Sequence, residues 1–300
     1  MKAVPGAMRF LLVDKPAGVT SHDVVAAARR GLGVRKVGHA GTLDPFATGL
    51  LVLAVGKATR LLEYLVGFDK TYRATARLGV ATDSQDRDGE RIAEDDNWTS
   101  LTLEQLEAAA AGMVGRLSQV PPVYSAVKVD GVPAHRRARR GERVALSPRE
   151  ITLGSFEILD HLPPRVHIRV VCSSGTYVRS LSVEFGKRLG TSCHLAELRR
   201  TRVGSLHVRH AASLASVEAG EPRQEAWVAA VSAMSHLPRV VVGAEQAAKL
   251  ADGRRVRGEA PDRSAAIFVL PGEQLVAVGA VRDGVLRPRK VFHESGGPGA

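Results

Sequence analysis

The apolar residues of this chain fall into short runs, and this constrains its fold more than any other feature. The longest runs, such as residues 50–55, are six residues long, about a third of what a membrane-spanning helix needs. They alternate with helical patterns that end at glycine, in the order strand, helix, strand, helix, strand. With 44% apolar and 24% charged residues in 300, this predicts a folded mixed α/β or α+β protein without a membrane span.

Local patterns predict several individual elements. The alternation of apolar and polar residues over 72–78 predicts a strand. We expect a helix that has Ser21 as its N-cap and ends near Gly31 and Gly33, and a short helix over residues 58–65. Thr102 and Gln105 predict a capping box before a helix that reaches Met113. The amphipathic segment over residues 177–189 is expected to end at Gly190.

Two changes of pattern along the chain predict its domain organisation. Residues 121–148 lose clear periodicity while arginines accumulate, which is typical of a basic surface insertion. Beyond residue 237, short β-branched runs alternate with Gly, Pro and Asp, which indicates a small β-rich module of about 60 residues. We therefore expect a main domain over residues 1–237 and a second domain over residues 238–300.

The positive charge of the chain is concentrated in one segment. The chain has 42 Lys and Arg against 31 Asp and Glu, and residues 165–210 alone hold nine basic residues against two acidic ones. Clustered cations on a folded chain favour a polyanionic partner such as nucleic acid. The alternatives are a solvated basic surface, or an Arg-rich composition overall, with 33 Arg against 9 Lys.

Cysteine content and the first residues predict the compartment. The two cysteines, Cys172 and Cys193, are too few for a disulfide framework or a four-cysteine metal site. The first ten residues have no apolar stretch followed by a small-residue cleavage site, so we expect no secretory signal. Both features predict a cytoplasmic protein.

The densest local motif is Lys36-Val-Gly-His-Ala-Gly-Thr-Leu-Asp-Pro-Phe-Ala-Thr-Gly-Leu-Leu51. Its glycines allow close backbone approach, and Pro45 restricts the backbone of Asp44, so the motif is expected to present a carboxylate. It lacks the spacing of a P-loop or a dinucleotide fingerprint. The alternative is a turn in which Asp44 only caps the next segment and His39 is a structural hydrogen-bonding residue.

Three further motifs carry charge. Residues 83–90 (DSQDRDGE) resemble a calcium loop in acid spacing but lack its final Glu, so we interpret them as an acidic turn and expect no metal. Residues 175–179 (GTYVR) and 198–201 (LRRT) both lie in the basic segment. Arg179 pairs either with a structural carboxylate or with a catalytic one.

Five motifs, at residues 36–51, 70–72 (KTY), 121–128 (PPVYSAVK), 175–179 and 198–201, occur in the order found in TruB-type tRNA pseudouridine synthases. The chain resembles this family over about residues 10–208. The resemblance implies the pseudouridine-synthase fold, an α+β architecture with a mixed, largely antiparallel sheet and flanking helices. It also implies that the insertion at about 121–148 clamps RNA and that residues 238–300 form a PUA-like RNA-binding domain. The implied reaction is isomerisation of uridine 55 in the T-arm of tRNA to pseudouridine, with base flipping.

The resemblance also implies roles for individual residues. Asp44 is the expected nucleophile. The expected substrate-binding residues are His39, Tyr72, Tyr177, Arg179 and Leu198. The expected contacts to the RNA backbone are Lys128, Arg136, Arg137, Arg139, Arg140, Arg199 and Arg200. The expected enzyme is a monomer that uses no cofactor and no metal, binds the tRNA T-arm stem-loop and does not bind membranes.

Three other functions remain open on the sequence. The first is the same chemistry on another RNA, and the second is a non-catalytic RNA-binding or tRNA-folding protein. The third, a metal-dependent nuclease using His39 and Asp44, is disfavoured because no acidic cluster accompanies those residues.

Overall fold

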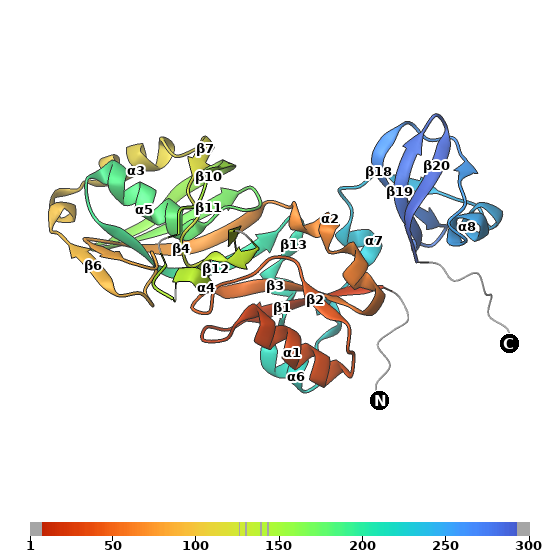
Figure 1. Ribbon diagram of the computed structural model, residues 1–300, viewed down its shortest axis with the longest axis horizontal. Coiled ribbons are helices and arrows are strands. Elements are labelled where there is room, and N and C mark those ends of the chain that lie inside the picture. The colour runs from red at the N-terminus through yellow and green to blue at the C-terminus, as the bar shows by residue number, and fades with distance from the viewer. Residues whose placement is uncertain (1–7, 126, 130, 139, 143, 293–300) are drawn as a thin grey trace.

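The computed structural model describes residues 8–125, 127–129, 131–138, 140–142 and 144–292. In this part of the chain most strands belong to an 11-stranded sheet, and a five-stranded sheet follows it toward the C-terminus (Figure 1). The sheets are mixed but mostly antiparallel, and helices flank them. The predicted α+β class with a strand-rich C-terminal part is therefore confirmed. None of the helices in the described ranges is long and apolar enough to cross a membrane.

The large sheet has the order β14-β1-β3-β12-β4-β11-β10-β7, with β2, β13 and β15 paired beside this path. Its strands are β1 (Arg9–Lys15), β2 (Val37–His39), β3 (Thr48–Val55), β4 (Lys70–Leu78), β7 (Gly115–Gln119), β10 (Arg149–Leu162), β11 (Arg165–Cys172), β12 (Cys193–Val203), β13 (Leu206–His207), β14 (Ala212–Ser213) and β15 (Trp227–Ala229). Two small hairpins, β5 (Val80–Thr82) with β6 (Arg91–Glu94) and β8 (Lys128–Val129) with β9 (Val132–Pro133), extend from it.

The helices begin and end where capping chemistry allows. They are α1 (Ser21–Leu32), α2 (Glu63–Val66), α3 (Leu103–Ala111), α4 (Ala134–Ala138), α5 (Val178–Leu189), α6 (Leu214–Glu218) and α7 (Ala230–Ala233). The Thr102 side chain forms the predicted capping box with Gln105. Gly190 ends α5 as predicted, with a left-handed φ of 72° that suits glycine.

Three local predictions were wrong in detail. The N-cap of α1 is Thr20, which forms a capping box with Asp23, and Ser21 is the first helical residue. The helix expected over residues 58–65 is a 3₁₀ segment, Gly56–Leu61, followed by the single turn of α2. The helix expected to reach Met113 ends at Ala111, because Gly112 caps it.

Helices α3 and α5 cover the half of the large sheet that runs from β12 to β7. The inward side of β4 carries Tyr72, Ala74, Ala76 and Leu78, which pack into one core with residues of both helices. In the other half, which runs from β14 to β3, α1 and α6 pack against β1 and β3 over a second core. Figure 1 shows these two groups of helices on either side of the centre of the sheet.

The sheet opens at its centre, between β3 and β12. These parallel strands pair only at Thr48 with Arg199 and at Gly49 with Arg200. Nearer the start of β12, Leu195 pairs instead with Asp86 of the loop at residues 83–90. The opening therefore holds two loops, residues 40–47 and 83–90, which carry Asp44 and Asp86.

The C-terminal sheet has the order β16-β18-β19-β20-β17. Its elements are β16 (Arg239–Val241), α8 (Ala244–Ala251), β17 (Val256–Arg257), β18 (Arg263–Leu270), β19 (Gln274–Arg282) and β20 (Val285–Val291). It has its own core on the side of α8. Its other side joins the main domain, because Ile267, Leu275 and Phe292 share a core with Met234. Arg60 adds a hydrogen bond of 2.8 Å to the carbonyl of Val291.

Candidate active site

The loop that carries Asp44 is held at several points of its backbone. The buried hydroxyl of Ser21 accepts a hydrogen bond from the amide of Leu43 and donates one to the carbonyl of the same residue, at 2.9 and 3.1 Å. Lys15 and the amide of Gly18 both donate to the carbonyl of Pro45, at 3.2 and 2.9 Å. The residues on both sides of Asp44 are therefore fixed to the start of α1 and the end of β1.

Arg200 supports the same loop from below. Its side chain is 1% exposed, and its guanidinium donates to the carbonyls of Gly41, Thr42 and Leu50 at 3.1, 3.2 and 2.8 Å. No carboxylate in the described ranges forms an ion pair with it. An arginine neutralised only by carbonyl dipoles is costly to bury, so its full set of hydrogen bonds must hold it in place.

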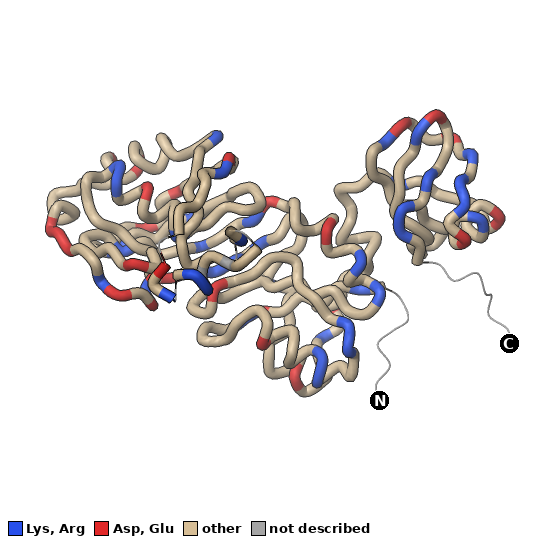
Figure 2. The backbone as a smooth tube through the Cα atoms, in the orientation of Figure 1, with Lys and Arg blue, Asp and Glu red and all other residues tan. Residues whose placement is uncertain are grey.

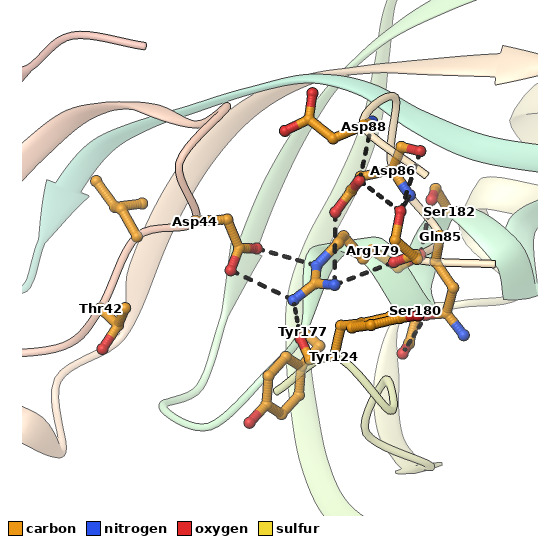
Figure 3. Close-up of polar contacts among 12 residues, drawn as sticks. Thr42, Asp44, Gln85, Asp86, Asp88, Tyr124, Tyr177, Arg179, Ser180 and Ser182 are labelled. Atoms are coloured by element: carbon orange, nitrogen blue, oxygen red, sulfur yellow. Dashed lines mark hydrogen bonds and ion pairs between the residues drawn. The ribbon is translucent and has the colours of Figure 1, made fainter. Parts of the chain in front are cut away.

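The carboxylate of Asp44 faces the guanidinium of Arg179, the second residue of α5 (Figure 3). The Arg179 Nε lies 2.9 Å from one carboxylate oxygen, and a terminal nitrogen lies 3.3 Å from the other. This two-point pairing fixes the orientation of the carboxylate as well as its position. The Arg179 side chain is 4% exposed, whereas that of Asp44 is 34% exposed, so the carboxylate is the member of the pair that solvent or a ligand reaches.

Arg179 is itself held by three other groups. Its guanidinium donates to the carbonyls of Ser84 and Tyr124 at 3.0 and 2.9 Å, and it lies 3.5 Å from a carboxylate oxygen of Asp86. Asp86 in turn accepts hydrogen bonds from the hydroxyl of Ser84 and the amide of Asp88, at 2.6 and 3.1 Å. The acidic turn thus supplies a second carboxylate to the site, and Figure 3 shows Asp44 and Asp86 approaching the Arg179 guanidinium from different directions.

Asp44 opens into a cleft of about 840 Å³. The cleft is lined by the start of α1, the loop with Asp44, the acidic turn, and Tyr124 and Ser125 of the insertion. His39 lines it as well, and its Nδ1 is buried without a hydrogen-bond partner in the described part of the chain. Two predicted partners, His39 and Arg179, are therefore brought together with Asp44 in one cavity.

Burial dominates the electrostatics of the site. It raises the pKa of Asp44, and the nearby Arg179 opposes this rise without cancelling it. Burial also lowers the pKa of His39, with the positive charge of Arg200 acting in the same direction. Lys15, buried beside the loop, has its pKa lowered to about 8, again mainly by burial. A carboxylate that is harder to ionise than usual and an imidazole that is harder to protonate than usual therefore share the cleft.

Three of the predicted substrate-binding residues lie elsewhere. Tyr72 and Leu198 are 7% and 8% exposed and pack in the core beneath the loop, together with Leu43 and Phe46. Tyr177 is half-buried at the residue before α5, where its backbone exchanges hydrogen bonds with the side chain of Gln119. None of the three lines the cleft of Asp44 in this conformation.

The predicted RNA-backbone contacts divide into surface and buried groups. Lys128, Arg136 and Arg140 are exposed on the insertion, where basic positions gather around α4 (Figure 2). Arg137 is half-buried, with an ion pair of 2.6 Å to Glu142. Arg139 lies outside the described residues.

The two arginines of β12 differ from each other. Arg199 is partly exposed and pairs with Asp14 through both terminal nitrogens, at 3.0 and 2.7 Å. Arg200 is buried under the loop and bound to backbone carbonyls, so it presents no exposed guanidinium to phosphates in this conformation, and its contact with RNA stays a prediction. Alternation along the strand sends the two adjacent side chains to opposite faces of the sheet, and this decides their different surroundings.

Sequence reasoning missed Lys15, Ser21 and Asp86 as parts of the site. Lys15 stands before a proline at the end of a strand, a position from which a side chain can reach an adjacent loop. Asp86 belongs to the segment that the sequence predicts to be an acidic turn with no further role. Tertiary contacts bring the side chains of Lys15 and Asp86 close to Asp44, and local sequence patterns do not report such contacts.

Residues 29–178 match the model of the TruB family pseudouridylate synthase N-terminal domain. A protein named tRNA pseudouridine synthase B from Leifsonia xyli subsp. xyli (strain CTCB07) is 45% identical over 278 residues, which cover 90% of this chain and 91% of that protein. This chain belongs to the TruB family of pseudouridylate synthases.

Other relatives agree with this assignment. A TruB-family protein of the same name from Ralstonia nicotianae (strain ATCC BAA-1114 / GMI1000) is 42% identical, over 94% of this chain and 93% of that protein. Among solved structures, one described as a Cbf5-Nop10-Gar1 complex aligns with a TM-score of 0.73 at 25% identity, covering 96% of this chain and 85% of that one. A second, an H/ACA RNP bound to a substrate RNA containing 2'-deoxyuridine, aligns at 0.72 and 24% identity. The structural likeness to these two solved structures thus extends over nearly the whole chain, C-terminal sheet included.

Proposed function

We propose that this TruB-family chain isomerises uridine 55 in the T-arm of tRNA to pseudouridine, with Asp44 as the nucleophile. The observation that carries the proposal is the pairing of Asp44 with Arg179 at the base of a cleft whose rim includes the basic insertion. The guanidinium favours the ionised carboxylate against the opposing effect of burial, so the nucleophile is available to a nucleotide that enters the cleft.

The reaction conserves atoms and redox state. The bond between N1 of the base and C1′ of the ribose breaks, and a bond between C5 and C1′ forms. The hydrogen on C5 leaves as a proton, and N1 gains one. Asp44 attacks the nucleotide to detach the base, and attack at C1′ or at C6 of the ring leads to the same product. Because nothing is oxidised or added, the proposed mechanism uses no cofactor.

The target uridine has to leave its stack before Asp44 reaches it. We propose that His39, which lines the cleft and has a ring nitrogen without a hydrogen-bond partner among the described residues, occupies the space that the base vacates. Tyr72 and Leu198 lie directly beneath the loop, and we propose that a shift of this loop exposes Tyr72 to stack on the uracil. Tyr177 would complete the pocket at the start of α5.

The exposed cations of the insertion would bind the RNA backbone. Lys128, Arg136 and Arg140 project from the segment that contributes Tyr124 to the cleft. Neutralising phosphates with such residues releases counterions and makes binding depend on salt. We further propose that residues 238–300 act as a PUA-like RNA-binding domain and that the enzyme is a cytoplasmic monomer.

Release of tritium from a T-arm hairpin labelled at C5 of the target uridine tests the proposal, since forming pseudouridine displaces that hydrogen. We expect release by the wild-type chain and none by Asp44→Asn. Release from a ribosomal RNA fragment but not from the hairpin would assign the same chemistry to another RNA. Tight hairpin binding without release from any RNA would instead support a binding or folding protein.

A further inference from the structure

Three arginines stand side by side on the face of the large sheet that points away from α3 and α5. Arg73 of β4 is in register with Arg199 of β12 on one side and with Arg169 of β11 on the other. The neighbouring residue Tyr72 packs into the helix-covered core, so Arg73 points to the opposite face. Adjacent strands lie about 4.8 Å apart, and like charges placed directly opposite each other destabilise a sheet.

Carboxylates compensate only the outer two arginines. Arg199 pairs with Asp14, and Arg169 lies 3.2 Å from Glu157. The exposed Arg73 makes no ion pair or side-chain hydrogen bond with any residue that the structure describes. The centre of the row therefore presents a positive charge that no carboxylate among the described residues neutralises.

A pocket of about 430 Å³ is lined by two arginines of this row, Arg73 and Arg199. Arg87 reaches it from the acidic turn, with its guanidinium 5.8 Å from the centre of the Phe46 ring. Phe46 and the half-exposed Leu159 give the pocket apolar walls. Of the residues that line the Asp44 cleft, this pocket shares only Phe46, so the two are separate cavities.

The floor of the pocket holds a chain of polar groups. Thr75 lies 3.0 Å from the Nδ1 of His167 and donates a hydrogen bond of 3.3 Å to Glu197. Glu197, Thr75 and His167 are in register with one another across β12, β4 and β11. Arg199 and Arg73 are in register two residues further along β12 and β4. A carboxylate accepts hydrogen bonds from hydroxyl groups, whereas guanidinium groups bind phosphate.

We propose that this pocket binds the phosphate group of a ribonucleotide. Arg73 is the central contact to the phosphate, and Arg87 and Arg199 flank it. Glu197 accepts hydrogen bonds from the sugar hydroxyls, and Phe46 and Leu159 pack on the base. The nucleotide is either free or part of an RNA chain, and this site does not depend on the reaction proposed for Asp44.

The imidazole signals in nuclear magnetic resonance spectra provide the test, because His167 lines this pocket and His39 lines the Asp44 cleft. We expect inorganic phosphate and uridine 5′-monophosphate to shift the His167 signals saturably. Arg73→Gln should weaken uridine 5′-monophosphate binding by about tenfold or more, the range for hydrogen bonds to charged groups. Arg202→Gln, an exposed arginine of β12 that does not line the pocket, is the matched control and should bind as wild type.

A melting experiment provides a second, independent measurement. Removing Arg73 relieves repulsion in the row, so Arg73→Gln should melt at or above the wild-type temperature without ligand. Uridine 5′-monophosphate should then raise the melting temperature of the wild type and not of the variant. A hexauridylate that binds ten times more tightly than the mononucleotide would identify an RNA chain as the occupant, whereas equal affinity would identify a free nucleotide.

Several results would overturn the proposal. Shifts confined to His39 would place the nucleotide in the Asp44 cleft. Equal binding by wild type and Arg73→Gln, or equal loss in Arg73→Gln and Arg202→Gln, would show that the arginine row is not a specific site. Each of these readouts is obtained without turnover, so they stand whether or not the chain forms pseudouridine.

Discussion

Arg179 and Asp44 are 135 residues apart in the chain, yet the guanidinium of one meets the carboxylate of the other at two points, 2.9 and 3.3 Å. The pair joins the first turn of α5 to the loop before β3. It thereby ties together the two halves of the sheet across the opening between β3 and β12. The geometry of the nucleophile proposed here thus depends on both halves being folded.

The pair predicts opposite pH shifts for two variants. Asp44 acts as a carboxylate, so activity is lost as pH falls through its pKa, which burial places above the usual value near 3.9 for aspartate. Arg179 lowers this pKa and Asp86 raises it. Arg179→Met should therefore move the acid limb of kcat/KM to higher pH, and Asp86→Asn should move it to lower pH. Shifts in the same direction would contradict the assignment.

Replacing the nucleophile should separate chemistry from binding. Asp44→Asn keeps the size of the side chain and removes its charge, so we expect tritium release to fall by at least about 10⁴-fold, the scale seen when a covalent nucleophile is removed. Hairpin affinity should stay within a few-fold of wild type, because the carboxylate contributes little to phosphate contacts. A parallel loss of affinity and turnover would indicate that Asp44 has a binding or structural role.

Arg200 should control the rate through the loop above it. Arg200→Met leaves three carbonyl groups without their donor, and we expect a loss of about 3 kcal/mol or more in unfolding free energy, since each such group costs about 1–3 kcal/mol. Arg200→Lys retains the charge but satisfies fewer carbonyls, so it should fold more stably than Arg200→Met and still turn over slowly. Denaturant unfolding combined with single-turnover rates measures both effects. Wild-type turnover in the lysine variant would contradict the loop-positioning role.

Gly49 is required where β3 meets β12. Its φ is 101°, and a Cβ there would lie 2.3 Å from the carbonyl oxygen of Arg200. Gly49→Ala should therefore separate the strands beside the Asp44 loop and cost about 3 kcal/mol or more. Gly67→Ala is the matched control, because a Cβ there meets nothing within 4 Å and φ is not positive. Thermal melting of both variants gives the comparison.

The exposed cations of the insertion should affect affinity more than rate. Arg136→Gln and Arg140→Gln each remove one proposed phosphate contact. Each variant should therefore reduce the slope of log affinity against log salt by about one. Single-turnover rates at saturating hairpin should change little. Arg30→Gln, an exposed arginine near the end of α1, is the control and should leave the slope unchanged. Unaltered slopes in the insertion variants would remove this segment from the RNA interface.

Local patterns were sufficient to predict many of the elements. The alternation of residues 72–78 predicted β4, and the glycines at 33 and 190 predicted the ends of α1 and α5. The weak predictions were at short segments, such as residues 58–65, where a 3₁₀ turn and an α-turn have nearly the same apolar spacing. The motif around Asp44 correctly indicated a presented carboxylate, because Gly allows backbone conformations that other residues disfavour and Pro restricts the residue before it, wherever they occur.

The sequence by itself determined the strands, the helix ends and the motif that presents Asp44, since these depend on periodicity and on the backbone preferences of nearby residues. Only the tertiary structure decided that Asp86 joins Arg179, that Lys15 and Arg200 hold the loop, and that Arg73 lies unneutralised between two arginines. The physical reason is that these relationships depend on strand order and register. A shift of one residue in β12 would exchange Arg199 and Arg200 between the surface and the core.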